Sequence, residues 1–207
     1  MTMNSPVVIE VAVNGGADKN RNPNSPQSPE EVAEVAAACI AAGASVIHTH
    51  IEDMYLPGKE AAERYRQAWQ PLRKAFPDVI LYPTIIFDDA PEVRFGHLPY
   101  LADGAADMGA LDPGSINLAI STDGGLPSRE LIYINSYRTI RFAFEQMEKL
   151  QLGPSLAIYD PTFLRSVIAW QRLGKLPRGA FVKLYFGGDR DFIRRSRRHQ
   201  LRPAADG

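Results

Sequence analysis

The sequence of 207 residues lacks the features that would place it in a membrane or in an oxidising compartment. It has one cysteine, Cys39, which cannot form an internal disulfide, and this fits a reducing cytosol. No apolar run approaches the roughly 18 residues that are needed to cross a bilayer. The first residues have neither the basic start nor the apolar stretch of a secretory signal. We therefore expect a cytoplasmic protein that has no membrane partner.

The sequence also lacks the motifs of two large ligand classes. No Gly-x-Gly-x-x-Gly turn follows a β-branched run, so a dinucleotide site is not expected. No nucleic-acid-binding motif is present either, and we expect no nucleic-acid partner. Six arginines against two aspartates give residues 190–207 a charge of +4, which leaves −5 for residues 1–189. We expect residues 1–188 to form the folded domain and residues 189–207 to be a basic, disordered tail.

The folded part alternates strand-like runs with helix-like segments. The strand-like runs are residues 6–13, 44–50, 79–85, 106–111, 155–159 and 180–186, and the helix-like segments are 32–42, 59–76, 91–101, 137–150 and 162–173. Ser28 and Pro29 form a helix start before the first helical segment, and Gly43 ends it. This alternation predicts parallel βαβ units, either in a (β/α)8 barrel or in a doubly wound sheet. Six strands are two fewer than a complete barrel, which typically needs roughly 250 residues.

The sharpest local signal is the run His48-Thr49-His50 at the end of the second strand. Side chains two positions apart on a strand share one face, so both imidazoles can reach the same point. Imidazole suits zinc and other transition metals, and the carboxyl ends of strands are where such folds build their sites. The alternative is a pair of histidines satisfied by backbone and solvent. Two ligands do not complete a zinc site, which needs a third histidine or a carboxylate.

Other polar residues lie at or near the carboxyl ends of the predicted strands. Glu10 lies within an apolar strand, where a carboxylate requires a partner, so it is either in an ion pair inside the sheet or a substrate contact. Each of the others is, taken alone, more often a turn or cap residue. Together they predict a polar rim around the two histidines: Thr84, Asp112, Ser115, Asn117 and Asp160.

At these residues the sequence resembles the β-keto acid cleavage enzymes. The resemblance covers residues 7 to 188, and its motifs occur in family order. The matching stretches are Val11–Gly16, Ser28–Glu31, Ala42–His50, Leu81–Thr84, Leu111–Asn117, Ala157–Pro161 and Val182–Phe186.

The resemblance implies a (β/α)8 barrel, usually oligomeric, that binds one Zn²⁺. It implies that a β-keto acid and acetyl-CoA are converted to acetoacetate and a shortened acyl-CoA, a reaction of amino acid catabolism. The family pattern assigns the zinc ligands to His48 and His50 and catalytic roles to Thr84 and Asp160. We interpret the remaining site residues as substrate contacts: Glu10, Asn14, Asp18, Asp112, Ser115 and Asn117.

The sequence departs from the family pattern at its C-terminal end. Family members continue with an arginine and a Gly-Leu-Glu-Asp-like segment that completes the zinc site and takes part in proton transfer, and no such segment follows Gly188. We therefore expect a truncated or frameshifted member, or a short variant completed by another chain, with weak zinc binding and little turnover. Two alternatives are a non-catalytic barrel remnant and a metal-dependent hydrolase of the amidohydrolase kind.

Overall fold

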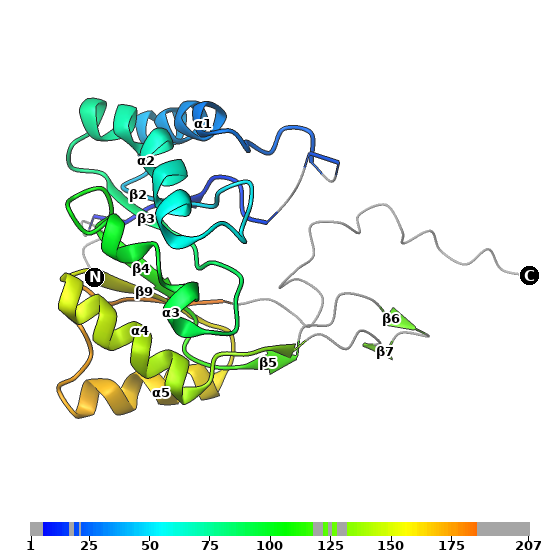
Figure 1. Cartoon of the computed structure of the whole chain (residues 1–207), viewed down its shortest axis with the longest axis vertical. Helices are drawn as coiled ribbons and strands as arrows, with labels where there is room; N and C mark the ends of the chain where they lie inside the picture. The colour runs from blue at the N-terminus through cyan, green and yellow to red at the C-terminus, as the bar shows by residue number, and fades with distance from the viewer. Residues whose placement is uncertain are drawn as a thin grey trace, which may run out of the picture.

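The computed structural model describes residues 6–16, 19–20, 22–117, 122–123, 126–127 and 132–185, and the predicted C-terminal tail lies outside these ranges. Within them, parallel strands alternate with helices (Figure 1). The main strands are β1 (Glu10–Ala12), β2 (Val46–Thr49), β3 (Ile80–Pro83), β4 (Met108–Leu111), β9 (Gly153–Ile158) and β10 (Phe181–Leu184). The helices are α1 (Pro29–Ala41), α2 (Gly58–Ala75), α3 (Pro91–Arg94), the short 3₁₀ helix η1 (Leu98–Tyr100), α4 (Tyr137–Leu150) and α5 (Pro161–Arg172).

The helix starts follow from local sequence. Ser28 accepts a hydrogen bond from Glu31 N at 3.3 Å while the Glu31 carboxylate accepts one from Ser28 N, so α1 begins with a reciprocal capping box. Ser136 caps α4 by accepting from Thr139 N, and Asp160 caps α5 by accepting from Thr162 N. The predicted helix at 91–101 is instead one turn of α-helix followed by η1, because Gly96 and Pro99 interrupt it.

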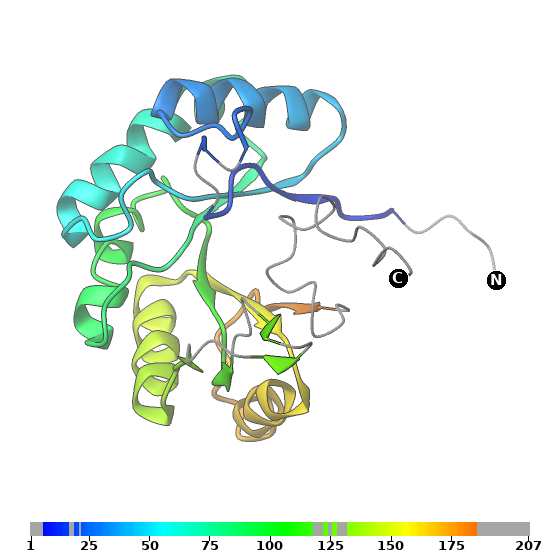
Figure 2. The same ribbon diagram turned by 90° about the vertical axis from the view of Figure 1, so that its right-hand side faces the viewer.

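The strands form one curved arc. β1, β2 and β3 pair in parallel, as do β4, β9 and β10. The two groups meet at β3 and β4, where Asp107 N donates to Leu81 O at 3.0 Å. Figure 2 shows the helices following the outside of this arc, so the strand order is that of a (β/α)8 barrel. Within the described residues the predicted fold class is confirmed as an incomplete barrel, and the doubly wound alternative is wrong because the helices cover one side of the sheet.

Two short hairpins follow β4. β5 (Ile116–Asn117) pairs antiparallel with β8 (Ile132–Tyr133), and β6 (Thr122–Asp123) pairs antiparallel with β7 (Leu126–Pro127). They occupy the loop between β4 and α4, which is a carboxyl-end loop of the barrel. Such loops commonly carry function in this architecture.

The buried apolar residues lie on both sides of the strands. The larger cluster fills the space between strands and helices and includes Trp69, Leu81 and Phe144. A smaller cluster of Val46, Tyr82 and Met108 lines the inner side of the arc. No helix in the described ranges has the length and apolar character that a membrane crossing would require.

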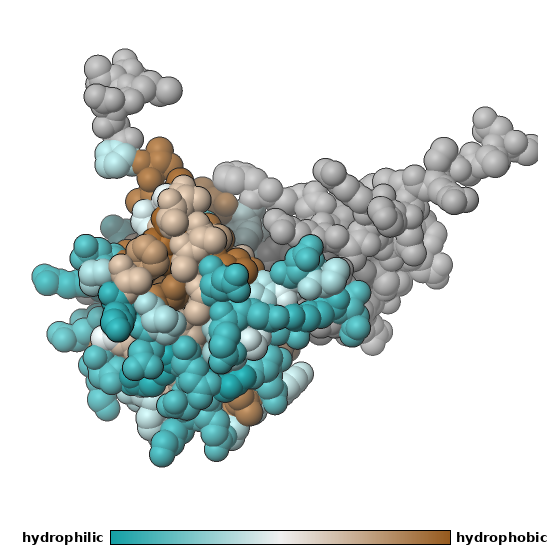
Figure 3. All heavy atoms as spheres, turned by 90° about the horizontal axis from the view of Figure 1, so that it is seen from above, coloured by the Kyte–Doolittle hydropathy of each residue, from teal (hydrophilic) through white to brown (hydrophobic). Residues whose placement is uncertain are grey.

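The two outer strands of the arc expose apolar side chains. Val182 and Leu184 of β10 are 41% and 54% exposed, while Phe181 and Lys183, which alternate with them, are turned inward and half-buried. Val7 is 81% exposed, and the predicted first strand is shortened to Glu10–Ala12. Figure 3 shows apolar surface gathered on one part of the molecule, beside largely polar surface.

We expect the 207-residue chain, expressed alone, to self-associate, since open strand edges and apolar patches both recruit partners. The double variant Val182→Lys with Leu184→Glu should raise the monomer fraction in static light scattering. Leu173→Glu is the matched control, because Leu173 is 72% exposed on the outer side of the barrel. A monodisperse parent monomer that melts cooperatively would contradict this expectation.

Candidate active site

The two histidines predicted to bind metal converge on one point. His48 lies on β2 and His50 directly follows it, and their Nε2 atoms are 3.2 Å apart. Two imidazole nitrogens at about 2.0–2.1 Å from a tetrahedral zinc ion lie about 3.3 Å apart. The spacing of the two Nε2 atoms therefore matches that of a bidentate metal site.

His48 is held with its Nε2 turned toward His50, with whose Nε2 it is within hydrogen-bond distance at 3.2 Å. Its Nδ1 lies 3.3 Å from the main-chain oxygen of Tyr82, to which a proton on Nδ1 can be donated. The Tyr82 ring stacks on the imidazole at 4.4 Å between centroids and 20° between planes. Burial, and then the nearby His50 and Lys183, lower the pKa of His48 well below its usual value. The ring is therefore neutral at neutral pH, as a metal ligand must be.

His50 is held through its main chain. Asn14 Nδ2 donates to His50 O at 2.9 Å, and Asn14 Oδ1 accepts from His50 N at 2.9 Å. Burial lowers the pKa of His50 to about 4. Both polar atoms of the Asn14 amide are thus engaged with His50, and the predicted substrate contact from Asn14 stays a prediction.

Beside His48, a polar network crosses the interior of the arc. The Lys183 ammonium donates to Glu10 Oε1 at 3.1 Å and to the Tyr82 hydroxyl at 2.8 Å, and the Tyr82 hydroxyl donates to the same Glu10 oxygen. Burial and then the Glu10 carboxylate raise the pKa of Tyr82. The ion pair that the sequence left open for Glu10 is therefore present, with a lysine 173 positions away.

The second group of predicted residues lies after β4. The Tyr133 hydroxyl donates to Asp112 Oδ2 at 2.6 Å, and burial raises the pKa of Asp112. Ser115 Oγ accepts from Asn135 N at 3.0 Å, which fixes the loop between β4 and α4. Asn117 is exposed on β5. Their roles as substrate contacts stay predictions.

Thr84 and Asp160 make contacts different from those of the histidine pair and of the group around Asp112. Thr84 is 9% exposed and its main-chain N–H donates to Thr49 O at 3.2 Å. Asp160 caps α5, and although partial burial acts in the opposite direction, hydrogen bonds from Thr162 lower its pKa. The capping role is the ordinary one that the sequence allowed, and the catalytic role stays a prediction. Asp18 lies outside the described residues.

Sequence reasoning missed three residues of this region. Tyr82 and Lys183 were not singled out, although a lysine inside the apolar strand β10 signals a buried partner. His97 was not singled out either, yet it is 1% exposed and its ring centroid lies 5.9 Å from that of Tyr65. Burial lowers its pKa to about 4, while the Thr84 main chain acts weakly in the opposite direction.

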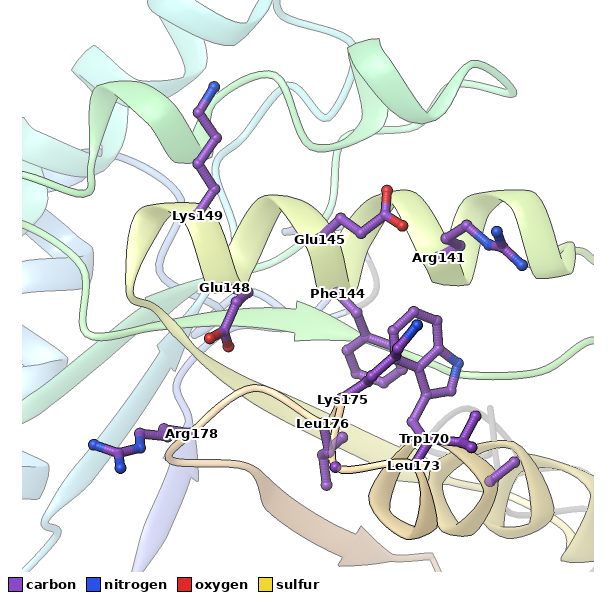
Figure 4. Close-up of a pocket in the computed structure, with 12 residues that line it drawn as sticks. Arg141, Phe144, Glu145, Glu148, Lys149, Trp170, Leu173, Lys175, Leu176 and Arg178 are labelled. Carbon is purple, nitrogen blue, oxygen red and sulfur yellow. The ribbon is translucent and has the colours of Figure 1, made fainter.

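Two further observations delimit the site. Within the described ranges, no group of three or more histidine, cysteine, aspartate or glutamate side chains is arranged to hold a metal. A pocket of about 820 Å³ lies instead on the outer side, between α4, α5 and the segment before β10. Figure 4 shows Phe144 and Trp170 in this pocket, with charged side chains around them. It belongs to the helical surface and not to the histidine site.

A family model for the beta-keto acid cleavage enzymes matches residues 6–200 of this chain. The chain belongs to this family. The match extends beyond Gly188, where the recognisable motifs end, and it sets aside the alternative of an amidohydrolase-like enzyme.

Relatives of known name agree with this family. The chain is 26% identical over 188 residues to a 3-oxoadipate:acetyl-CoA acetyltransferase of Cupriavidus necator, covering 89% of this chain and 61% of that protein. It is 28% identical over 174 residues to a 3-keto-5-aminohexanoate cleavage enzyme of Fusobacterium nucleatum, covering 81% of this chain and 58% of that protein. The chain thus spans about three fifths of the length of these relatives.

Solved structures support the fold alone. A complex of ObcA with a C4-CoA adduct and oxalate aligns with a TM-score of 0.59 at 17% identity, covering 79% of this chain and 38% of ObcA. Dihydropteroate synthase of Yersinia pestis aligns with a TM-score of 0.53 at 14% identity, covering 89% of this chain and 64% of the synthase.

We expect His97 to make the stability depend on pH. Its folded pKa of about 4 lies below the usual 6.5, so the unfolded chain binds the proton more tightly. The stability that neutral His97 contributes is complete above about pH 6.5 and is lost as the pH falls toward 4, at about 1 kcal/mol per pH unit.

His97→Phe should reduce this slope in urea unfolding measured across that range. His48 and His50 contribute slopes of the same sign, so the comparison is between the parent and the variant. Equal slopes in the two proteins would contradict the assignment.

Proposed function

We propose that this chain carries the metal-binding part of a β-keto acid cleavage site, which converts a β-keto acid and acetyl-CoA to acetoacetate and a shortened acyl-CoA. The observation that carries the proposal is the 3.2 Å approach of the His48 and His50 Nε2 atoms at the carboxyl end of a barrel strand. Family membership supports the reaction class, and the names of both relatives agree with it.

The donor set fits zinc, with one ligand still to be supplied. Both imidazoles are neutral and turn Nε2 toward a common point, and the Nδ1 atom of His48 has the carbonyl partner that typically orients such a ligand. A third ligand would come from outside the described residues. A zinc ion bound there would polarise the keto carbonyl and stabilise negative charge that develops on its oxygen.

The side chains around the histidines would bind and orient the substrates. Lys183 uses two of its three donors on Glu10 and Tyr82, so a third N–H remains for a ligand atom in the interior. Burial raises the pKa of Asp112, so this carboxyl holds a proton more readily than an exposed carboxyl does. We assign the Thr84 hydroxyl and the Asp160 carboxylate to catalysis, and Glu10, Asn14, Asp18, Asp112, Ser115 and Asn117 to the substrate-binding region.

The assembly that performs the reaction is expected to be a homo-oligomer. The exposed apolar side chains of β10 favour association between copies, because nothing in the described chain covers them. The residues that alternate with them face inward, where Lys183 already pairs with Glu10. We expect small-molecule substrates and place the protein in the cytoplasm.

The metal site is tested by elemental analysis after equilibration with zinc and by Co²⁺ absorption spectroscopy. We expect binding weaker than at a site with three protein ligands, and we expect His48→Ala and His50→Ala to abolish it. His97→Phe is the matched control, because it removes a buried histidine that is no part of the pair. Stoichiometric zinc in the His48→Ala, His50→Ala double variant would rule out this site.

The reaction is tested by incubating the zinc-loaded chain with acetyl-CoA and a series of β-keto acids that includes 3-oxoadipate and 3-keto-5-aminohexanoate. Acetoacetate and the new acyl-CoA are followed by mass spectrometry. We expect slow turnover that falls to background in His50→Ala and by about 100-fold or more in Thr84→Val. Zinc-loaded protein that forms no acetoacetate from any of these acids would contradict the cleavage reaction while leaving the metal site in place.

A further inference from the structure

Thr49, the residue between the two histidines, faces the opposite side of β2. Its side chain is fully buried toward the helices, with 0% exposure, and its Oγ1 accepts a hydrogen bond from Trp69 Nε1 at 3.1 Å. Trp69 is 1% exposed on α2. Because neighbouring residues of a strand point to opposite faces, the conformation of Thr49 helps to set the directions of both imidazoles.

This anchor lies where the regular strand ends. β2 ends at Thr49, so His50 lies beyond the paired part of the strand. Asn14 holds the main chain of His50 from the side of β1. Trp69 bonds to the preceding residue, Thr49, from the side of α2. Thr49 and His50 are therefore held by hydrogen bonds from two different parts of the chain.

We propose that Trp69, acting through Thr49, is a positioning residue for the His48 and His50 pair. The inference rests on the proposed metal site. A chelate requires both Nε2 atoms to stay near 3.2 Å, and a small rotation of the main chain at Thr49 moves the two imidazoles relative to each other. A buried indole N–H that loses its acceptor must find another or remain unpaired at a free-energy cost, which favours a shift of the main chain at this point.

The neighbouring tyrosine supplies a matched control. Tyr65 packs against Trp69 with ring centroids 5.0 Å apart and is equally buried on the same face of α2. Its hydroxyl makes no hydrogen bond to β2, although the main chains of Thr84 and Ile51 lie close enough to act on its pKa against the effect of burial. Tyr65→Phe therefore removes one polar atom from the same packing layer without removing a bond to β2.

The experiment compares Thr49→Val, Thr49→Ser, Trp69→Phe and Tyr65→Phe in the full chain. Thr49→Val keeps the shape and removes the acceptor, whereas Thr49→Ser keeps the acceptor. We expect Thr49→Val and Trp69→Phe to weaken Co²⁺ binding by about tenfold or more, as is typical when a residue that orients a ligand is lost. Thr49→Ser and Tyr65→Phe should stay close to the parent.

A second measurement does not require the metal. The stacked Tyr82 ring shifts the imidazole proton resonances of His48 in the metal-free chain, and these resonances should move in Thr49→Val but not in Tyr65→Phe. Melting temperatures identify any variant that is unfolded.

Each outcome decides the question. Unchanged Co²⁺ affinity and unchanged resonances in Thr49→Val would overturn the positioning role. If the parent binds no Co²⁺, the proposed metal site fails, and the metal-free resonances alone decide the role of Trp69. Equal effects of Thr49→Val and Tyr65→Phe would show that the hydrogen bond from Trp69 to Thr49 contributes no more than ordinary core packing, and would also overturn the inference.

Discussion

The arrangement of the site depends on the network of Glu10, Tyr82 and Lys183. Its three side chains come from β1, β3 and β10, so it connects the two outer strands of the arc across the interior. A carboxylate and an ammonium are costly to bury singly, and each compensates the other here. The same Tyr82 ring stacks on His48, and its main-chain oxygen lies opposite His48 Nδ1. The contact that connects the two outer strands therefore also orients His48, the first of the two proposed ligands.

The features that the sequence predicted correctly are local ones. Ser28, Pro29 and Glu31 are close neighbours in the chain, and their capping pattern is readable without any partner. The alternation of strands and helices follows from apolar periodicity and predicted parallel βαβ units, whereas the choice of a barrel over a doubly wound sheet came from the family resemblance. The convergence of His48 and His50 follows from the two-residue period of a strand, which places both imidazoles on one face. In each case the residues concerned are close neighbours along the chain, so their arrangement depends on local geometry alone.

The features that the sequence could not supply depend on distant partners. Glu10 and Lys183 are 173 positions apart in the chain, and Trp69 and Thr49, which share a hydrogen bond, are 20 positions apart. The position of Glu10 in an apolar strand predicted that it has a partner. It did not predict which residue that is, because several strands present residues to the interior. For Asp160 the difficulty is different, because an aspartate can serve as a helix cap or as a catalytic acid. In the structure Asp160 caps α5, and its catalytic role stays a prediction.

The electrostatics of the histidine pair follow first from burial and, for His48, also from Lys183 of this network. Burial keeps both imidazoles neutral, which frees Nε2 for a metal and makes the folded state less stable in acid. Lys183 adds a positive charge nearby that disfavours protonated His48, and the same charge would also repel a metal cation. The Glu10 carboxylate, 3.1 Å from the ammonium, reduces that repulsion because the pair is neutral as a whole. Removing Glu10 alone would leave a buried ammonium beside the two histidines, so the carboxylate would favour a cation at the proposed metal site without contacting it.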